Sequence, residues 1–150
     1  WVQKDPQPTS VDGARMQLDL AYSGNHALIT ANLAGTSASA NDVDGTTTIR
    51  SGPIQLPATV GSLTFRYYFA HGPRSDRNDA FRVFVEADGT KTQVFREYGT
   101  AFVDRARWVK AGTPLTEWAG KTVRIVFEAT DGGPDSLIEA GVDDVHVEQP

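Results

Sequence analysis

Three separate segments of this chain carry apolar residues at every second position, and this limits its fold more than any other feature. The segments are Leu63–Phe69, Phe81–Glu86 and Lys121–Glu128. Successive side chains of a β-strand point to opposite faces of a sheet, so a period of two predicts strands with one buried face. The core is therefore expected to contain Leu63, Phe65, Tyr67, Phe69, Phe81, Val83, Val85, Val123, Ile125 and Phe127.

Turn-forming residues interrupt the sequence at short intervals. Its 14 Gly and 8 Pro are typical of many short strands, and Asp88-Gly89 predicts a hairpin. Pro114–Gly120 is the one helical turn expected, and the first fifteen residues are expected to run as extended coil. Further strands are expected at 26–31, 46–54, 92–98 and 138–147. The sequence thus predicts one domain over 1–150, an all-β, two-sheet antiparallel β-sandwich (jelly roll) with about eight or nine strands.

Charge and cysteine content exclude several classes of function. The formal net charge of −5 argues against a nucleic-acid partner. No apolar run approaches the ~18 residues of a membrane span. Without cysteine, the chain has no disulfide, thiol nucleophile or Cys-type zinc site. Because it starts at Trp1 and its single methionine is Met16, we expect an excerpt of a longer secreted protein.

Asn41–Gly45 is the first candidate metal site. Alternate carboxylates from Asp42 and Asp44, followed by glycine, can wrap Ca²⁺, which takes six to eight oxygen ligands. The segment is not an EF-hand, because the twelfth position from Asp42 is Pro53. A simple turn explains the same residues. Further acids in predicted loops are Asp5, Asp76, Asp79, Asp131 and Asp135.

The last predicted strand contains a phase break. Its apolar residues take even positions up to Val142 and odd positions from Val145, with Asp143 and Asp144 between. Either a β-bulge lies here, or one of these aspartates shares the apolar face. Both aspartates can be solvated at a strand edge, or Asp143 can ligate a metal from inside the sandwich.

No catalytic signature stands out. His71–Asp79 contains His, Ser and Asp, but one contiguous loop does not supply a triad with an oxyanion hole. A glycosidase needs two facing carboxylates, and the available glutamates, Glu97, Glu117 and Glu139, lie in no recognisable motif.

Sugar binding by stacking is an alternative use of the aromatic side chains, although aromatics of a sandwich are more often core. The candidates are Trp1, Tyr22, Tyr68, Tyr98 and Trp118. Outward strand positions carry Arg66, Arg82, Arg96 and Arg124. We expect these arginines to pair with Glu86, Glu97 and Glu128 on a solvated face.

Several motifs together resemble a known family. They are Trp1–Thr9, Leu28–Thr30, Ala40–Thr48, Ile49–Ile54, Leu63–His71 and Gly141–Val147. They look like the accessory jelly roll at the C-terminus of secreted bacterial peptidases, above all M14-type zinc carboxypeptidases of actinobacteria. Related jelly rolls occur as MAM domains, proprotein-convertase P domains and carbohydrate-binding modules.

The resemblance implies a structural Ca²⁺ held between an N-terminal segment, a loop and the last strand. The matching positions are Asp5, Asp42, Asp44 and Asp143, and the loop acid Asp79 completes our set of candidate ligands. Lys4 departs from the family pattern, where glycine is expected. The zinc ligands of the peptidase have no counterpart here.

We therefore expect a non-catalytic, Ca²⁺-stabilised accessory domain of a secreted peptidase. Its partners would be the catalytic peptidase domain of the same polypeptide and a polysaccharide or protein surface. The alternative is a carbohydrate-binding module of a secreted hydrolase, and the third possibility is a jelly-roll glycosidase.

Overall fold

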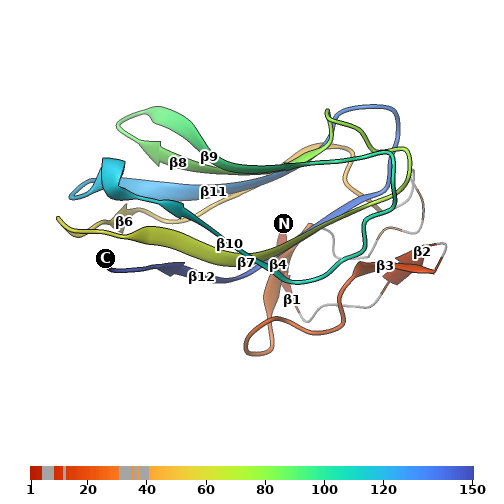
Figure 1. The fold of residues 1–150 in the computed structure, drawn as a ribbon, viewed down its shortest axis with the longest axis horizontal. Helices are drawn as coiled ribbons and strands as arrows, with labels where there is room; N and C mark the ends of the chain where they lie inside the picture. The colour runs from red at the N-terminus through yellow and green to blue at the C-terminus, as the bar shows by residue number, and fades with distance from the viewer. Residues whose placement is uncertain (5–8, 12, 31–34, 36, 38–40) are drawn as a thin grey trace.

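The fold is a sandwich of two stacked antiparallel sheets, with a small hairpin outside one of them (Figure 1). The computed structural model describes residues 1–4, 9–11, 13–30, 35, 37 and 41–150. The predicted fold class is confirmed, and the expected helical turn is present as a 3-10 turn, η1 (Thr116–Trp118). Within the described residues, no helix has the length and apolar character needed to cross a membrane.

Each sheet has a simple strand order. Sheet I runs β1 (Val2–Lys4), β4 (Ala27–Ile29), β12 (Ile138–Val147), β7 (Ser62–His71) and β10 (Val109–Pro114). Sheet II runs β5 (Gly45–Arg50), β11 (Thr122–Asp131), β8 (Ala80–Ala87) and β9 (Thr90–Tyr98), and β6 (Ile54–Gln55) pairs with the start of β11. The outer hairpin consists of β2 (Thr9–Val11) and β3 (Ala14–Gln17).

The core lies between the two sheets and is built from the period-two residues. All ten predicted core residues are buried, with at most 6% of any one exposed. Phe65 packs edge-on against Phe127, with 5.5 Å between ring centroids, and Tyr67 stacks on Phe81 at 5.1 Å. The alternation in the sequence therefore predicted these core residues correctly.

A second apolar cluster covers the outer face of sheet I. Met16 of the outer hairpin is buried there beside Tyr68 of β7. This corrects the prediction of N-terminal coil, since β1 pairs with β4 and β2 pairs with β3. The physical reason is that Tyr68 and Ala70 are apolar side chains on the outer face, and the N-terminal segment removes them from water.

The phase break in β12 is a bulge. Its register against β7 shifts between Asp143 and His146, and Asp144 has φ of 52°. Val147 then lies opposite Leu63, back on the core side. Asp143 lies opposite Arg66, in the outward phase of sheet I. It therefore does not point into the sandwich, which corrects the idea of a ligand reaching a metal from inside.

Candidate functional site

The outer face of sheet II is open, unlike that of sheet I. In Figure 1, none of the described strands lies over it. We call this surface the open face. Its charged members point outward between core residues of the same strands: Arg50, Arg82, Glu86, Lys91, Arg96, Arg124 and Glu128. The open face is thus the accessible sheet surface on which a ligand can lie.

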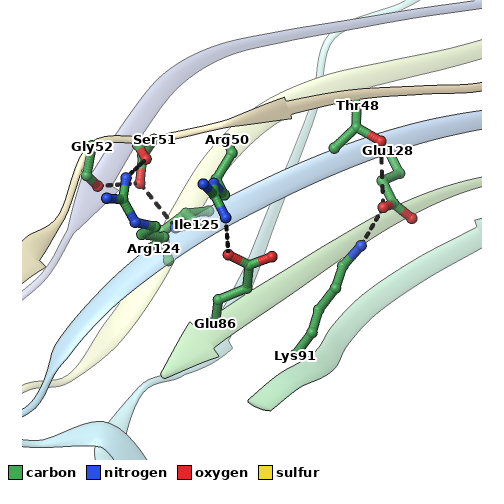
Figure 2. A network of polar contacts seen from close by, with 9 residues as sticks. All are labelled: Thr48, Arg50, Ser51, Gly52, Glu86, Lys91, Arg124, Ile125 and Glu128. Carbon is green, nitrogen blue, oxygen red and sulfur yellow. Dashed lines mark hydrogen bonds and ion pairs between the residues drawn. The ribbon is translucent and has the colours of Figure 1, made fainter. Parts of the chain in front are cut away.

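A network of polar contacts orders part of the open face (Figure 2). Arg50 Nη1 lies 3.0 Å from Glu86 Oε2, and Lys91 forms an ion pair with Glu128. Arg124 Nη1 donates to the carbonyl oxygen of Ser51 at 2.8 Å. Exposed ion pairs contribute little to stability, roughly 0–1 kcal/mol each. Their main effect here is to hold donors and acceptors in fixed positions.

A groove of about 380 Å³ hollows the end of the open face beside the β8–β9 turn. This volume lies within the ~300–1,000 Å³ common for small-ligand sites. Its lining combines cationic, anionic and hydroxyl groups: Arg50, Glu86, Asp88, Lys91, Thr122 and Arg124. Such a lining can form hydrogen bonds to a ligand rich in hydroxyl groups.

Two arginines face each other farther along the open face. Arg82 and Arg96 are direct cross-strand partners. Arg82 Nη1 donates to Thr130 Oγ1 at 3.2 Å, and the guanidinium of Arg96 lies 4.9 Å from the centre of the Tyr98 ring. Arg77 approaches the same ring at 5.2 Å. Among the described residues, neither Arg82 nor Arg96 forms an ion pair.

In the described part of the chain, none of the four expected arginines forms an ion pair with a glutamate, so this prediction is wrong. Glu86 pairs with Arg50, and Glu128 pairs with Lys91. Glu97 accepts a hydrogen bond from the Tyr67 hydroxyl, whose pKa is raised by burial and by that carboxylate. Arg66 belongs to sheet I, where it lies 4.1 Å above the Tyr22 ring.

The predicted metal ligands do not gather at one place. Val43 N donates to the carbonyl oxygen of Ile138, which brings the Asp42–Asp44 loop to the start of β12. Asp143 lies five residues farther along that strand, ~16 Å away at a strand's rise. Its carboxylate accepts hydrogen bonds from the N–H groups of Ser23 and Asp144, at 2.9 and 2.7 Å.

The remaining acids add no complete metal site. Asp5 lies outside the described residues. In the described part of the chain, no group of three or more His, Asp or Glu side chains has an arrangement that holds a metal ion. Burial raises the pKa of Asp42, and the charges of Asp44 and Asp135 add to this effect. Asp44 and Asp135 therefore each repel Asp42.

Asp79 is a structural carboxylate that organises two loops. It is fully buried and accepts hydrogen bonds from Ser75 Oγ at 2.7 Å, Ser136 Oγ at 3.1 Å and Gly132 N at 3.0 Å. Burial opposes its charged form, but these bonds outweigh that effect and lower its pKa. Asp131 beside it has its pKa raised to about 6, mainly by burial.

The loop His71–Asp79 contains the three side chains considered for a triad, and the histidine does not lie between the serine and the aspartate. Ser75 is bonded to Asp79, whereas His71 Nδ1 lies 3.2 Å from the carbonyl oxygen of Gly72. These contacts give no hydrogen-bonded sequence from serine through histidine to aspartate.

Glu139 is a buried carboxylate that the sequence analysis named only as a possible glycosidase acid. It is on the outer side of β12, beneath the N-terminal segment, and is 0% exposed. Thr30 Oγ1 donates to it at 2.9 Å and Gly35 N at 2.5 Å, and Gln17 forms a further hydrogen bond. Burial nevertheless raises its pKa to about 7. Glu97 lies on sheet II, so these two glutamates do not form a facing pair.

The five candidate aromatics do not form a common platform for a sugar. Tyr68 and Trp118 are buried, and Trp1 packs against Phe81 at the edge of the core. Tyr22 lies beneath Arg66 of sheet I, and Tyr98 lies beneath Arg96 of sheet II. These five positions therefore do not form a sugar-binding site based on stacking.

Comparison with known proteins identifies the fold. No family model matches the chain, and neither does any curated protein. A solved carbohydrate-binding module, TmCBM61 in complex with β-1,4-galactotriose, is 13% identical with a TM-score of 0.54, over 87% of this chain and 75% of that one.

Two further solved structures cover 99% of this chain. The K3 cleaved adhesin domain of Lys-gingipain from Porphyromonas gingivalis w83 is 14% identical, with a TM-score of 0.55 over 98% of its length. A carbohydrate-binding module of the β-sandwich superfamily is 12% identical, with a TM-score of 0.55 over 56% of its length. At these identities the likeness concerns the fold, which is the β-sandwich of carbohydrate-binding modules and adhesin domains.

Proposed function

We propose that this chain is a non-catalytic, polysaccharide-binding domain of a secreted protein, and that it binds its ligand at the open face. The observation that carries the proposal is the contrast between the two sheets. The outer face of sheet I is covered by the N-terminal segment, whereas none of the described strands lies over the outer face of sheet II, which is hollowed to a groove of about 380 Å³ (Figure 1). The shared fold with solved carbohydrate-binding modules supports the same conclusion.

The groove suits sugar hydroxyls because each hydroxyl both donates and accepts hydrogen bonds. Arg50 and Glu86, held 3.0 Å apart, present a donor and an acceptor side by side. Arg124 is anchored to the backbone at Ser51. Groups that are already fixed lose less conformational entropy when a ligand binds.

Catalysis is not part of the proposal. A glycosidase needs one carboxylic acid that donates a proton and a second carboxylate that faces it. The two glutamates of the open face are each paired with a cation, Glu86 with Arg50 and Glu128 with Lys91. Each of these carboxylates is therefore held by a cation rather than by a facing carboxylate.

Titration calorimetry against a panel of soluble polysaccharides tests the proposal. Arg50→Ala and Arg124→Ala should each weaken binding at least ~10-fold, the loss of roughly one charge-assisted hydrogen bond. Arg105→Ala, at an exposed position of the β9–β10 connection, is the matched control and should bind like the parent. Binding by both groove variants at the parent affinity would rule out the groove, and hydrolysis of any glycan by the purified chain would rule out a purely binding role.

An accessory role beside a peptidase is a finer proposal. It rests on the resemblance of the motifs to peptidase-associated jelly rolls, and the fold shared with a cleaved adhesin domain of Lys-gingipain is consistent with it. A zinc carboxypeptidase domain in the same reading frame would support this host, and a glycoside hydrolase there would favour the alternative.

Calcium binding is a separate proposal, located at the Asp42–Asp44 loop. Its support is the repulsion of Asp42 by Asp44 and by Asp135, which a divalent cation would relieve. The distance from this loop to Asp143 argues against a single ion that joins the two.

A further inference from the structure

We infer that the ligand of the open face is an anionic polysaccharide that carries carboxylate groups, as in a polyuronate. This inference rests on the proposed function and names its substrate class. It starts from the charge of the open face, whose strands carry five outward cations and two carboxylates, an excess of three positive charges. Asp88 at the groove pairs with Lys121, so this pair leaves the excess unchanged. The whole chain carries a formal net charge of −5. The open face therefore has the opposite sign to the molecule that bears it.

The excess is concentrated at one position. Arg82 and Arg96 are direct cross-strand neighbours, and like charges in that arrangement destabilise a sheet. Within the described chain, no carboxylate pairs with either arginine. Arg77, which shares the Tyr98 ring with Arg96, brings a third guanidinium to the same end of the face. An external anion between these groups would replace repulsion with attraction.

The shape of the guanidinium group selects the kind of anion. Its planar donors match the two oxygens of a carboxylate. On the same face, the guanidinium of Arg50 already pairs with the carboxylate of Glu86 through one contact, from Nη1 to Oε2 at 3.0 Å. At the arginine pair the corresponding carboxylate is missing from the described residues and would come from the ligand.

A polymer fits better than a small acid. Arg82 lies four residues from Glu86 along β8, so the arginine pair and the groove are separated by ~13 Å. A chain of sugar acids can place one ring in the groove and a carboxylate of another ring at the arginine pair. An acidic polypeptide would satisfy the arginines but would leave the hydroxyl-binding groups of the groove without sugar partners.

The test compares three probes by calorimetry at low ionic strength: polygalacturonate, its fully methyl-esterified form, and poly-L-glutamate. We expect polygalacturonate to bind at least ~10-fold more tightly than the ester. Added salt should reduce this advantage, because the pairing is exposed. Poly-L-glutamate should bind more weakly than polygalacturonate, and equal or tighter binding would overturn the inference in favour of an acidic protein partner.

The double variant Arg82→Gln/Arg96→Gln should lose the preference for polygalacturonate over its ester. The control Arg105→Gln/Lys110→Gln removes the same charge elsewhere and should keep it. The test variant should melt no lower than the parent, since a like-charge contact is removed. If it retains the preference, the arginine pair is not the anion site and the inference is wrong.

The binding of the parent protein separates this inference from the proposed function. If neutral glycans bind at the groove and polygalacturonate binds no more tightly, the inference fails while the proposed function stands. If no glycan binds, both fail.

Discussion

At the scale of single residues, Glu139 has the clearest energetic consequence. Burial raises its pKa from an ordinary value of 4.5 to about 7, so the folded state binds a proton that the unfolded chain releases. The protonated carboxyl therefore contributes its full stabilisation of the fold below pH ~4.5, and this contribution is lost as the pH rises through about 7. The free energy of unfolding should fall by roughly 3 kcal/mol across that window.

Urea unfolding between pH 4 and 8, in chelator, measures this slope. Glu139→Gln removes one titrating group and should reduce the decline to the part that Asp131 contributes up to about pH 6. Glu117→Gln, at an exposed position of η1, should leave the parent curve unchanged. A parent curve without any decline between pH 4.5 and 7.5 would show that Glu139 remains charged in the fold at low cost.

Asp79 should be the carboxylate whose loss costs most stability. Asp79→Ala removes the acceptor of the buried Ser75 Oγ and of the part-buried N–H groups of Asp76 and Gly132, whereas Ser136 Oγ keeps Asp131 as a second acceptor. Each unsatisfied buried donor costs ~1–3 kcal/mol, so we expect a loss of more than ~3 kcal/mol in denaturant unfolding. Ser75→Ala removes one donor and should cost about 1 kcal/mol. Equal effects of the two variants would contradict this role.

At the scale of elements, the contact between β12 and β7 shapes the surface against which the N-terminal segment packs. A Cβ at Gly141 would lie 2.2 Å from Cε1 of Tyr68, so Gly141→Ala must displace this ring. Tyr68 packs edge-on against Trp108, with 5.0 Å between ring centroids. We therefore expect a change in Trp108 fluorescence and a loss of ~1–3 kcal/mol from overpacking.

Gly52→Ala is the control, because an added Cβ there meets no atom within 4 Å and the residue does not have a positive φ. It should change neither the fluorescence nor the unfolding free energy by more than ~0.5 kcal/mol. If Gly141→Ala behaves in the same way, the second apolar cluster is loosely packed and does not fix the N-terminal segment.

At the scale of the whole molecule, the calcium proposal makes a prediction about melting. An ion bound only by the folded state adds ~2.7 kcal/mol at a hundredfold excess over Kd. For 150 residues this is a rise of roughly 5–10 °C in the melting temperature. Asp44→Asn should blunt the difference between millimolar Ca²⁺ and chelator, whereas Asp143→Asn should retain it, because Asp143 lies elsewhere on β12. Identical melting in calcium and chelator would refute the site.

The sequence by itself determined the fold class, the core and the position of the bulge. These follow from local periodicity: an alternating strand such as Leu63–Phe69 has one face that must leave water, whichever strand it pairs with. The same logic located the break at Asp143-Asp144. It missed the strand at Val109–Pro114, where Gly112 and Pro114 obscure the alternation.

Only the tertiary structure decided which outer face is covered, and with it where a ligand can lie. Arg66 and Arg82 both occupy outward positions of strands, yet Arg66 lies beside the covered layer and Arg82 on the open face. Glu139 and Glu86 likewise occupy outward positions, one buried and the other beside a groove. Such differences come from pairing between segments far apart in the chain, and a period of two within one strand contains no information about its partners.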